Sequence, residues 1–146
     1  MLVKTLAGAV EGVDARTIIV EANAGGNVLE NKPWYNVIGL PDNSIREGSY
    51  SIETAIKNSG YKCRRIKVII NLAPADVRKE GSAYDFPIAM ALLHATQEIQ
   101  AENLDNYMLM GELSLDGSLR PFKGALPMAI KARQQKYKGI VLPKAN

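Results

Sequence analysis

The stretch that most constrains the fold is 66–87, where a strand pattern leads through a polar loop into a helix pattern. Alternating apolar residues at its start, Ile66–Leu72, predict a strand, which Pro74 ends. The loop ends at Asp85, which we predict to cap an apolar helix extending to about Thr96. A loop between a strand and a helix N-terminus often holds chemistry, because exposed N–H groups there favour anions.

The rest of the chain alternates between strand and helix patterns, and Asp116-Gly117 is a typical hairpin turn. We expect one domain over 1–146, of the α/β (α+β) class, with a mixed sheet and helices packed on one face. The patterns predict helices from 42 or 43 to 60 and over 125–135, and strands over 2–10, 17–21, 34–40, 107–115, 118–120 and 139–142.

Composition excludes several classes of protein. No apolar run approaches the roughly 18 residues of a membrane span, and the N-terminus lacks the features of a signal peptide. A single cysteine, Cys63, rules out an internal disulfide and a cysteine-rich zinc site. We expect no metal site, no membrane partner and a reducing, cytoplasmic location.

The chain is mildly basic, with a net charge of +3 and a pI near 9.0, which permits nucleic acid as a partner. One candidate basic patch lies at one end of the strand that begins at residue 66, and a second lies on the last helix. The alternative is that these cations are on ordinary solvated faces and bind no nucleic acid. The first candidate comprises Arg64, Arg65, Lys67, Arg78 and Lys79, and the second comprises Lys131, Arg133, Lys136 and Lys138.

Ser82 and Lys123 are the candidate nucleophile and base, because each lies just before a predicted helix. A lysine whose pKa is lowered by burial can activate a serine. The alternative is a loop serine that bonds a helix start and a solvated lysine.

Asp76, Glu80 and Asp85 lie on one loop and are candidates for acid/base chemistry or for holding Mg²⁺. The simpler interpretation, which we favour, is a charged loop that pairs with itself and has Asp85 as the N-cap of the next helix. His94 lies within an apolar helix, where a structural role is the default. No Gly-Lys dipeptide occurs, so the chain lacks a Walker A motif and is not expected to bind ATP.

Four motifs together resemble one family, the magnesium-chelatase-like AAA+ ATPases of the ComM or YifB type. They are VIGLPD at 37–42, NLAPADVRKEGS at 71–82, GELSLDGSLRP at 111–121 and VLPKAN at 141–146. The resemblance implies that an AAA+ ATPase domain follows residue 146, and the pattern at 143–146, a loop ending on a helix cap, fits a chain cut at that point.

The resemblance further implies a hexameric, ATP-driven helicase that promotes branch migration of DNA during competence and recombination. ATP and Mg²⁺ are then expected in the ATPase domain, and the partners are that domain, neighbouring subunits and DNA. The implied fold of this chain is similar to ribosomal protein S5 domain 2, which the Lon proteolytic domain and the C-terminal domain of RadA share.

The resemblance to Lon can be followed residue by residue. Matching through Ile88-Ala89 puts Asp85 at the position of Lon's catalytic serine, and matching through 111–124 puts Leu126 near that of its lysine. The main hypothesis is therefore a non-catalytic N-terminal domain that contributes to assembly or DNA contact. The alternatives are a Lon-like peptidase that uses Ser82 and Lys123, and a free-standing nucleic-acid-binding module.

Overall fold

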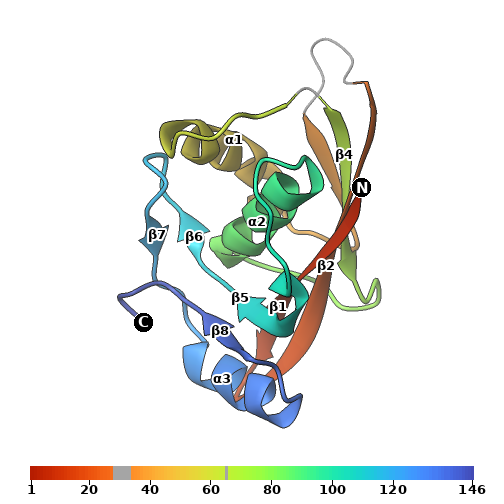
Figure 1. Ribbon diagram of the computed structural model, residues 1–146. Helices are drawn as coiled ribbons and strands as arrows, with labels where there is room; N and C mark the ends of the chain where they lie inside the picture. Colours follow the sequence, from red (N-terminus) through yellow and green to blue (C-terminus); the bar gives the residue numbers. More distant parts are fainter. Residues whose placement is uncertain (28–33, 65) are drawn as a thin grey trace.

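The computed structural model describes residues 1–27, 34–64 and 66–146 (Figure 1). They form a six-stranded sheet with strand order β3-β4-β2-β1-β5-β8 and a separate two-stranded sheet, β6-β7. The strands are β1 (Leu2–Glu11), β2 (Asp14–Asn27), β3 (Tyr35–Ile38), β4 (Ile66–Ala73), β5 (Tyr107–Leu109), β6 (Glu112–Leu113), β7 (Leu119–Arg120) and β8 (Gly139–Val141). The helices are α1 (Asn43–Asn58), η1 (Ser82–Tyr84), α2 (Asp85–Ala95), η2 (Leu104–Asn106) and α3 (Ala125–Gln134).

The centre of the sheet is the long β1–β2 hairpin, whose pairing runs from Leu2↔Asn23 to Glu11↔Asp14. β2 extends well beyond the predicted strand over 17–21, because it pairs with β1 on one side and with β4 on the other. Backbone hydrogen bonds to both neighbours hold the polar residues of β2 in the strand, although the apolar pattern of the sequence did not extend to them.

The sheet is mixed, as predicted. β2 runs antiparallel to both β1 and β4, whereas β3 pairs with β4, β5 with β1 and β8 with β5 in parallel. This combination of a long hairpin with parallel edges confirms the α+β class.

Helices α1 and α2 cover one face of the sheet, and α2 is apolar nearly all round because it lies between β1–β2 and α1. Thr5 on β1 points to this face, since its Oγ1 donates a hydrogen bond of 3.0 Å to the carbonyl oxygen of Pro87. Helix α3 contacts β1 through Gly8, three residues later, where an added Cβ would lie 2.7 Å from Met128. Because side chains alternate along a strand, α3 covers the opposite face at this end of the sheet, so the predicted packing of helices on one face holds for α1 and α2 but not for α3.

The strand predicted over 107–115 is interrupted at Gly111. There the N–H of Gly111 donates to the carbonyl oxygen of Ala83 at 2.8 Å, and its own carbonyl oxygen accepts from the N–H of Phe86 at 3.0 Å. The chain therefore leaves the large sheet after β5, passes the start of α2 and forms the small β6–β7 hairpin (Figure 1).

Candidate functional site

Ser82 and Lys123 line the same pocket, although they are 41 positions apart in the sequence. The pocket has a volume of about 340 Å³ and lies between the loop that leads into α2 and the loop that leads into α3. Its floor is β1 near Gly8, whose carbonyl oxygen accepts a 3.1 Å hydrogen bond from the Tyr84 hydroxyl. The fold thus brings the two sequence-predicted residues to one surface depression.

The two side chains do not form an assembled dyad. Within the described part of the chain, neither Ser82 Oγ nor Lys123 Nζ takes part in a hydrogen bond or an ion pair. Lys123 is exposed, and the carboxylates of Glu80 and Glu112 also line the pocket. A serine–lysine dyad needs the amine within hydrogen-bond reach of the serine hydroxyl, and no such contact exists among the described residues.

The pocket has residues that the sequence did not single out, notably Gly8, Tyr84 and Glu112. They come from β1, from η1 and from the start of β6. Tyr84 is two residues from Ser82 on η1, whereas the fold brings Gly8 and Glu112 to Ser82 from distant parts of the sequence. Only the strand order, which the sequence pattern does not supply, would have revealed them.

Asp42 anchors the loop that carries Ser82. Its Oδ1 accepts a 2.9 Å hydrogen bond from the N–H of Ile45, so Asp42 and not Asn43 caps the helix that was predicted to start at 42 or 43. Its Oδ2 accepts a 2.8 Å hydrogen bond from the N–H of Gly81. One carboxylate therefore ties α1 to the wall of the pocket.

Asp85 does not cap its helix, and this corrects the sequence-based prediction. Its side chain is 4% exposed, and Oδ2 accepts a 3.1 Å hydrogen bond from the N–H of Leu113 on β6 instead of from an N–H of α2. Two backbone carbonyls occupy the N–H groups at the helix start, since Asp85 itself donates to Ser82 O and Phe86 donates to Gly111 O. The carboxylate is therefore directed to the neighbouring hairpin.

Burial raises the pKa of Asp85 from 3.8 to about 7, opposed by the Leu113 hydrogen bond and reinforced by the negative charge of Glu112. The charge of Asp85 in turn adds to burial in raising the pKa of the Tyr35 hydroxyl. A carboxyl group with this pKa could exchange a proton near neutral pH, but its low exposure keeps it from substrate.

The other two carboxylates of the loop do not join Asp85. Glu80 pairs with Arg78, with 3.2 Å between Nε and Oε1, and both side chains are about 70% exposed. Asp76 is exposed. Among residues 1–27, 34–64 and 66–146 there is no group of three or more His, Cys, Asp and Glu side chains placed to hold a metal ion. His94 lies in the last turn of α2, half-buried.

Lys79 is fully buried, with an exposed fraction of 0%. Its Nζ donates to the carbonyl oxygens of Gly39, at 2.6 Å, and of Pro74. Its backbone N–H and C=O bond to Leu40 and Asp42. Burial is the main cause that lowers the pKa of its amine, partly offset by the negative charge of Asp76. The residue joins two loops and offers no surface to a nucleic-acid phosphate.

The remaining basic candidates do not gather at one end of β4 as the sequence suggested. Arg64 precedes the strand and Arg78 follows it, and the eight extended residues of the strand span about 25 Å. Lys67 is an exposed residue near the first end, and Arg65 lies outside the described residues. The first basic patch is therefore split by the length of the strand.

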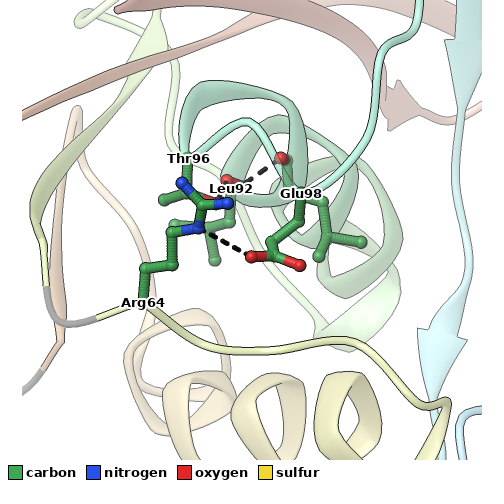
Figure 2. A network of polar contacts seen from close by, with 5 residues as sticks. Arg64, Leu92, Thr96 and Glu98 are labelled. Carbon is green, nitrogen blue, oxygen red and sulfur yellow. Dashed lines mark hydrogen bonds and ion pairs between the residues drawn. The ribbon is translucent and has the colours of Figure 1, made fainter.

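Arg64 also has a partner within the fold. Figure 2 shows that its side chain contacts Glu98. The ion pair joins Nε of Arg64 to Oε1 of Glu98 at 2.7 Å. Beside it, Thr96 Oγ1 donates a 2.8 Å hydrogen bond to the carbonyl oxygen of Leu92 at the end of α2. Arg64 thus fastens the segment before β4 to the end of α2, which leaves less of its charge for an external anion.

Comparison with known proteins gives a family match over most of the chain. The model of the family described as subunit ChlI of Mg-chelatase matches residues 25–146. The chain belongs to this family. No helix in the described part of this ChlI-family chain is long and apolar enough to cross a membrane.

Several relatives support the assignment to the ChlI family. The chain is 43% identical over 130 residues to the uncharacterised protein YifB of Escherichia coli, a match that covers 89% of this chain and 25% of YifB. It is 33% identical over 135 residues to the competence protein ComM of Haemophilus influenzae, covering 92% of this chain and 26% of ComM. The chain thus spans about a quarter of the length of these relatives.

A more distant similarity links this ChlI-family chain to a protease. It is 28% identical over 115 residues to Lon protease 2 of Bacillus subtilis, covering 75% of this chain and 20% of that protein. The family resemblance seen in the motifs is therefore shown, and so is its distant relation to Lon. The two residues that the sequence analysis matched to the Lon catalytic positions are Asp85, which is buried in the structure, and Leu126, which is 71% exposed.

Proposed function

We propose that this chain is a non-catalytic N-terminal domain of a magnesium-chelatase-like AAA+ ATPase that moves branched DNA during competence and recombination. Its task is to help assemble the ring or to contact DNA, while ATP and Mg²⁺ bind to the ATPase domain of the longer protein. The family match to ChlI and the similarity to ComM and YifB support this proposal.

One observation carries the non-catalytic part. At the start of α2, where the Lon relationship places a nucleophile, stands a carboxyl group that is 4% exposed and bonded to the N–H of Leu113. A buried carboxylate used in this way holds the β6–β7 hairpin against α2. It is not placed to attack a peptide.

The test compares the full ATPase with a form that lacks residues 1–146. We expect the truncated protein to hydrolyse ATP but to lose ring assembly, measured by light scattering, or DNA branch migration, measured on synthetic four-way junctions. The matched control is the full protein with Ser82→Ala and Lys123→Ala, which should keep both activities. Unchanged assembly and branch migration after truncation would refute the proposed role.

A Lon-like peptidase is the second candidate, because Ser82 and Lys123 line one pocket. A serine-reactive fluorophosphonate probe distinguishes the two proposals. We expect no labelling of the wild-type chain above the level of Ser82→Ala. Labelling that disappears in both Ser82→Ala and Lys123→Ala, while Ser114→Ala retains it, would establish a dyad and replace the main proposal.

A further inference from the structure

The charges of this chain are strongly segregated along the sequence. All 15 Asp and Glu residues lie within 1–116, whereas 117–146 contain seven of the 18 Lys and Arg residues and no acidic residue. The acid-free segment includes β7, which pairs with β6, and then α3 and β8, which lie side by side at one end of the fold (Figure 1). A surface region rich in cations attracts anions over several ångströms.

A second pocket lies beside α3 and holds two cations from different elements. It has a volume of about 390 Å³, and both Arg16 of β2 and Lys131 of α3 line it. The lining includes no Asp or Glu. The other lining residues are uncharged: Thr17, Ile19, Ala73, Pro74, Gln135 and Tyr137. The pocket therefore combines two positive charges with hydroxyl and amide donors and an apolar wall.

Both cations are available to a ligand. In the described ranges, ion pairs occupy Lys57, Arg64, Arg78 and Arg120, and neither Arg16 nor Lys131 belongs to one. Thr17 Oγ1 and the Tyr137 hydroxyl lie 3.2 Å apart and share one hydrogen bond, which leaves one of the two hydroxyl hydrogens to donate elsewhere. The lining can thus supply several donors to one anionic group.

The helix dipole alone does not account for this arrangement. Cations near the C-terminus of a helix are stabilising, and that explains Lys131 and Arg133 in the last turn of α3. It does not explain Arg16, which comes from a strand, or the absence of any acidic residue from 117 onward.

We propose that this pocket, centred on Arg16 and Lys131, binds a phosphate of a nucleic-acid backbone. The exposed cations that continue along the end of α3, Arg133, Lys136 and Lys138, contact the phosphates that follow. The inference rests on the proposed DNA-processing function and assigns the DNA contact to the second basic candidate, on α3, instead of to Arg64 and Lys67 at the start of β4.

The chemistry of the pocket favours a backbone phosphate over other anions. A guanidinium fork, an ammonium group and neutral donors suit a phosphate, to which arginine donates two parallel hydrogen bonds. The apolar wall of Ile19, Ala73 and Pro74 offers a surface for the attached sugar. A row of cations leading away from the pocket suits a polymer with regularly spaced charges.

The test measures binding of the chain to fluorescein-labelled single-stranded and double-stranded oligonucleotides by fluorescence anisotropy at several salt concentrations. We expect Arg16→Ala/Lys131→Ala to weaken binding by roughly tenfold or more at low salt. We also expect the slope of log K against log salt concentration to fall by about two, because two phosphate contacts are lost. Arg16→Lys/Lys131→Arg should restore most of the affinity, and circular dichroism with urea unfolding checks that each variant is folded.

The matched comparison is Arg64→Ala/Lys67→Ala, which removes the same charge from the other end of the molecule. We expect its affinity to stay within about twofold of wild type and its salt slope to be unchanged. Equal losses in both double variants, a larger loss in Arg64→Ala/Lys67→Ala, or no binding by the wild-type chain would each overturn the proposal. So would complete displacement of the oligonucleotide by a mononucleotide, which would assign the pocket to a small phosphate monoester.

Failure of this inference and failure of the proposed function are distinguishable. If the full ATPase carrying Arg16→Ala/Lys131→Ala still binds and remodels junctions normally, the pocket proposal fails and the domain function stands. If removal of residues 1–146 changes neither assembly nor branch migration, the domain function fails.

Discussion

At the scale of single residues, Lys79 and Arg78 are neighbours with opposite environments. The amine of Lys79 is fully buried against the carbonyl oxygens of Gly39 and Pro74, whereas the side chain of Arg78 is 72% exposed. We predict that Lys79→Ala lowers the free energy of unfolding by about 2–4 kcal/mol, because two buried acceptors lose their donor. The measurement is urea unfolding followed by circular dichroism.

Arg78→Ala is the matched control for that prediction. Its exposed ion pair with Glu80 contributes little, so we expect a change of no more than about 0.5 kcal/mol. Similar values for the two variants would mean that the buried amine does not hold the two loops together.

Asp85 makes stability depend on pH in a direction opposite to that of most carboxylates. Its pKa is raised from 3.8 to about 7, so the folded state holds the proton more tightly than the unfolded state. The contribution of the group to stability is therefore full below about pH 4 and is lost as the pH rises to about 7.

We predict that Asp85→Asn, which keeps an acceptor for the Leu113 N–H but carries no charge, removes this dependence. The free energy of unfolding of the variant should exceed that of wild type by about 2–4 kcal/mol at pH 8 and by much less at pH 4. The check is a series of urea unfolding curves between these pH values. Parallel profiles for the two proteins would show that Asp85 does not titrate in this range.

The sequence placed the first helix cap at Asp42 or Asn43 and the second at Asp85, and the structure confirms Asp42 but not Asp85. Asp42 follows an extended segment and meets free N–H groups, so the local capping rule applies. Asp85 follows the short helix η1, and a carbonyl from Gly111, distant in the sequence, has already satisfied the N–H of Phe86. A local rule cannot anticipate a partner that arrives through tertiary structure.

At the scale of elements, the contact between α1 and α2 depends on the absence of a side chain at Gly48. A Cβ at this position would lie 2.8 Å from Asp85 Oδ1. Gly48 is also in the interior of α1, where alanine would normally stabilise the helix by about 1 kcal/mol. The two effects oppose each other, and the clash should dominate.

A double-mutant cycle separates the two effects. We predict that Gly48→Ala destabilises the wild-type chain but stabilises an Asp85→Ala background by up to about 1 kcal/mol, because the obstructing oxygen is gone. The changes are measured as free energies of unfolding at constant pH. The same sign in both backgrounds would show that Asp85 does not set the distance between the helices.

Most elements follow from their patterns, whereas their extent and grouping do not. The apolar helix α2 and the strand β4 are close to their predicted bounds, because the spacing of their apolar side chains indicates which faces are buried. The 107–115 strand divides at Gly111, where hydrogen bonds to the start of α2 replace the sheet ladder. The sequence analysis grouped Arg64 and Arg78 in one patch because it did not take into account that the whole length of β4 lies between them.

At the scale of the whole molecule, the strand order decides which residues meet. Pairing of β1 with both β2 and β5 carries Gly8 beneath Ser82 and places α3 on the face away from α2. The sequence indicated a mixed sheet but contained no signal for this order, which is why the residues of both pockets could not be assembled in advance.

The long β1–β2 hairpin also has a consequence for how the protein folds. Its pairs, such as Leu6↔Ile19, join residues that are close in the sequence, whereas the pair Leu6↔Met108 closes a loop of about a hundred residues. Local pairs cost less chain entropy, so we expect the hairpin to form early. β5 then pairs with β1 of the formed hairpin, and β8 pairs with β5. The face around α3 would then be the last part of the surface to take shape, and a nascent chain would expose the cations of this face before the core beneath them has closed.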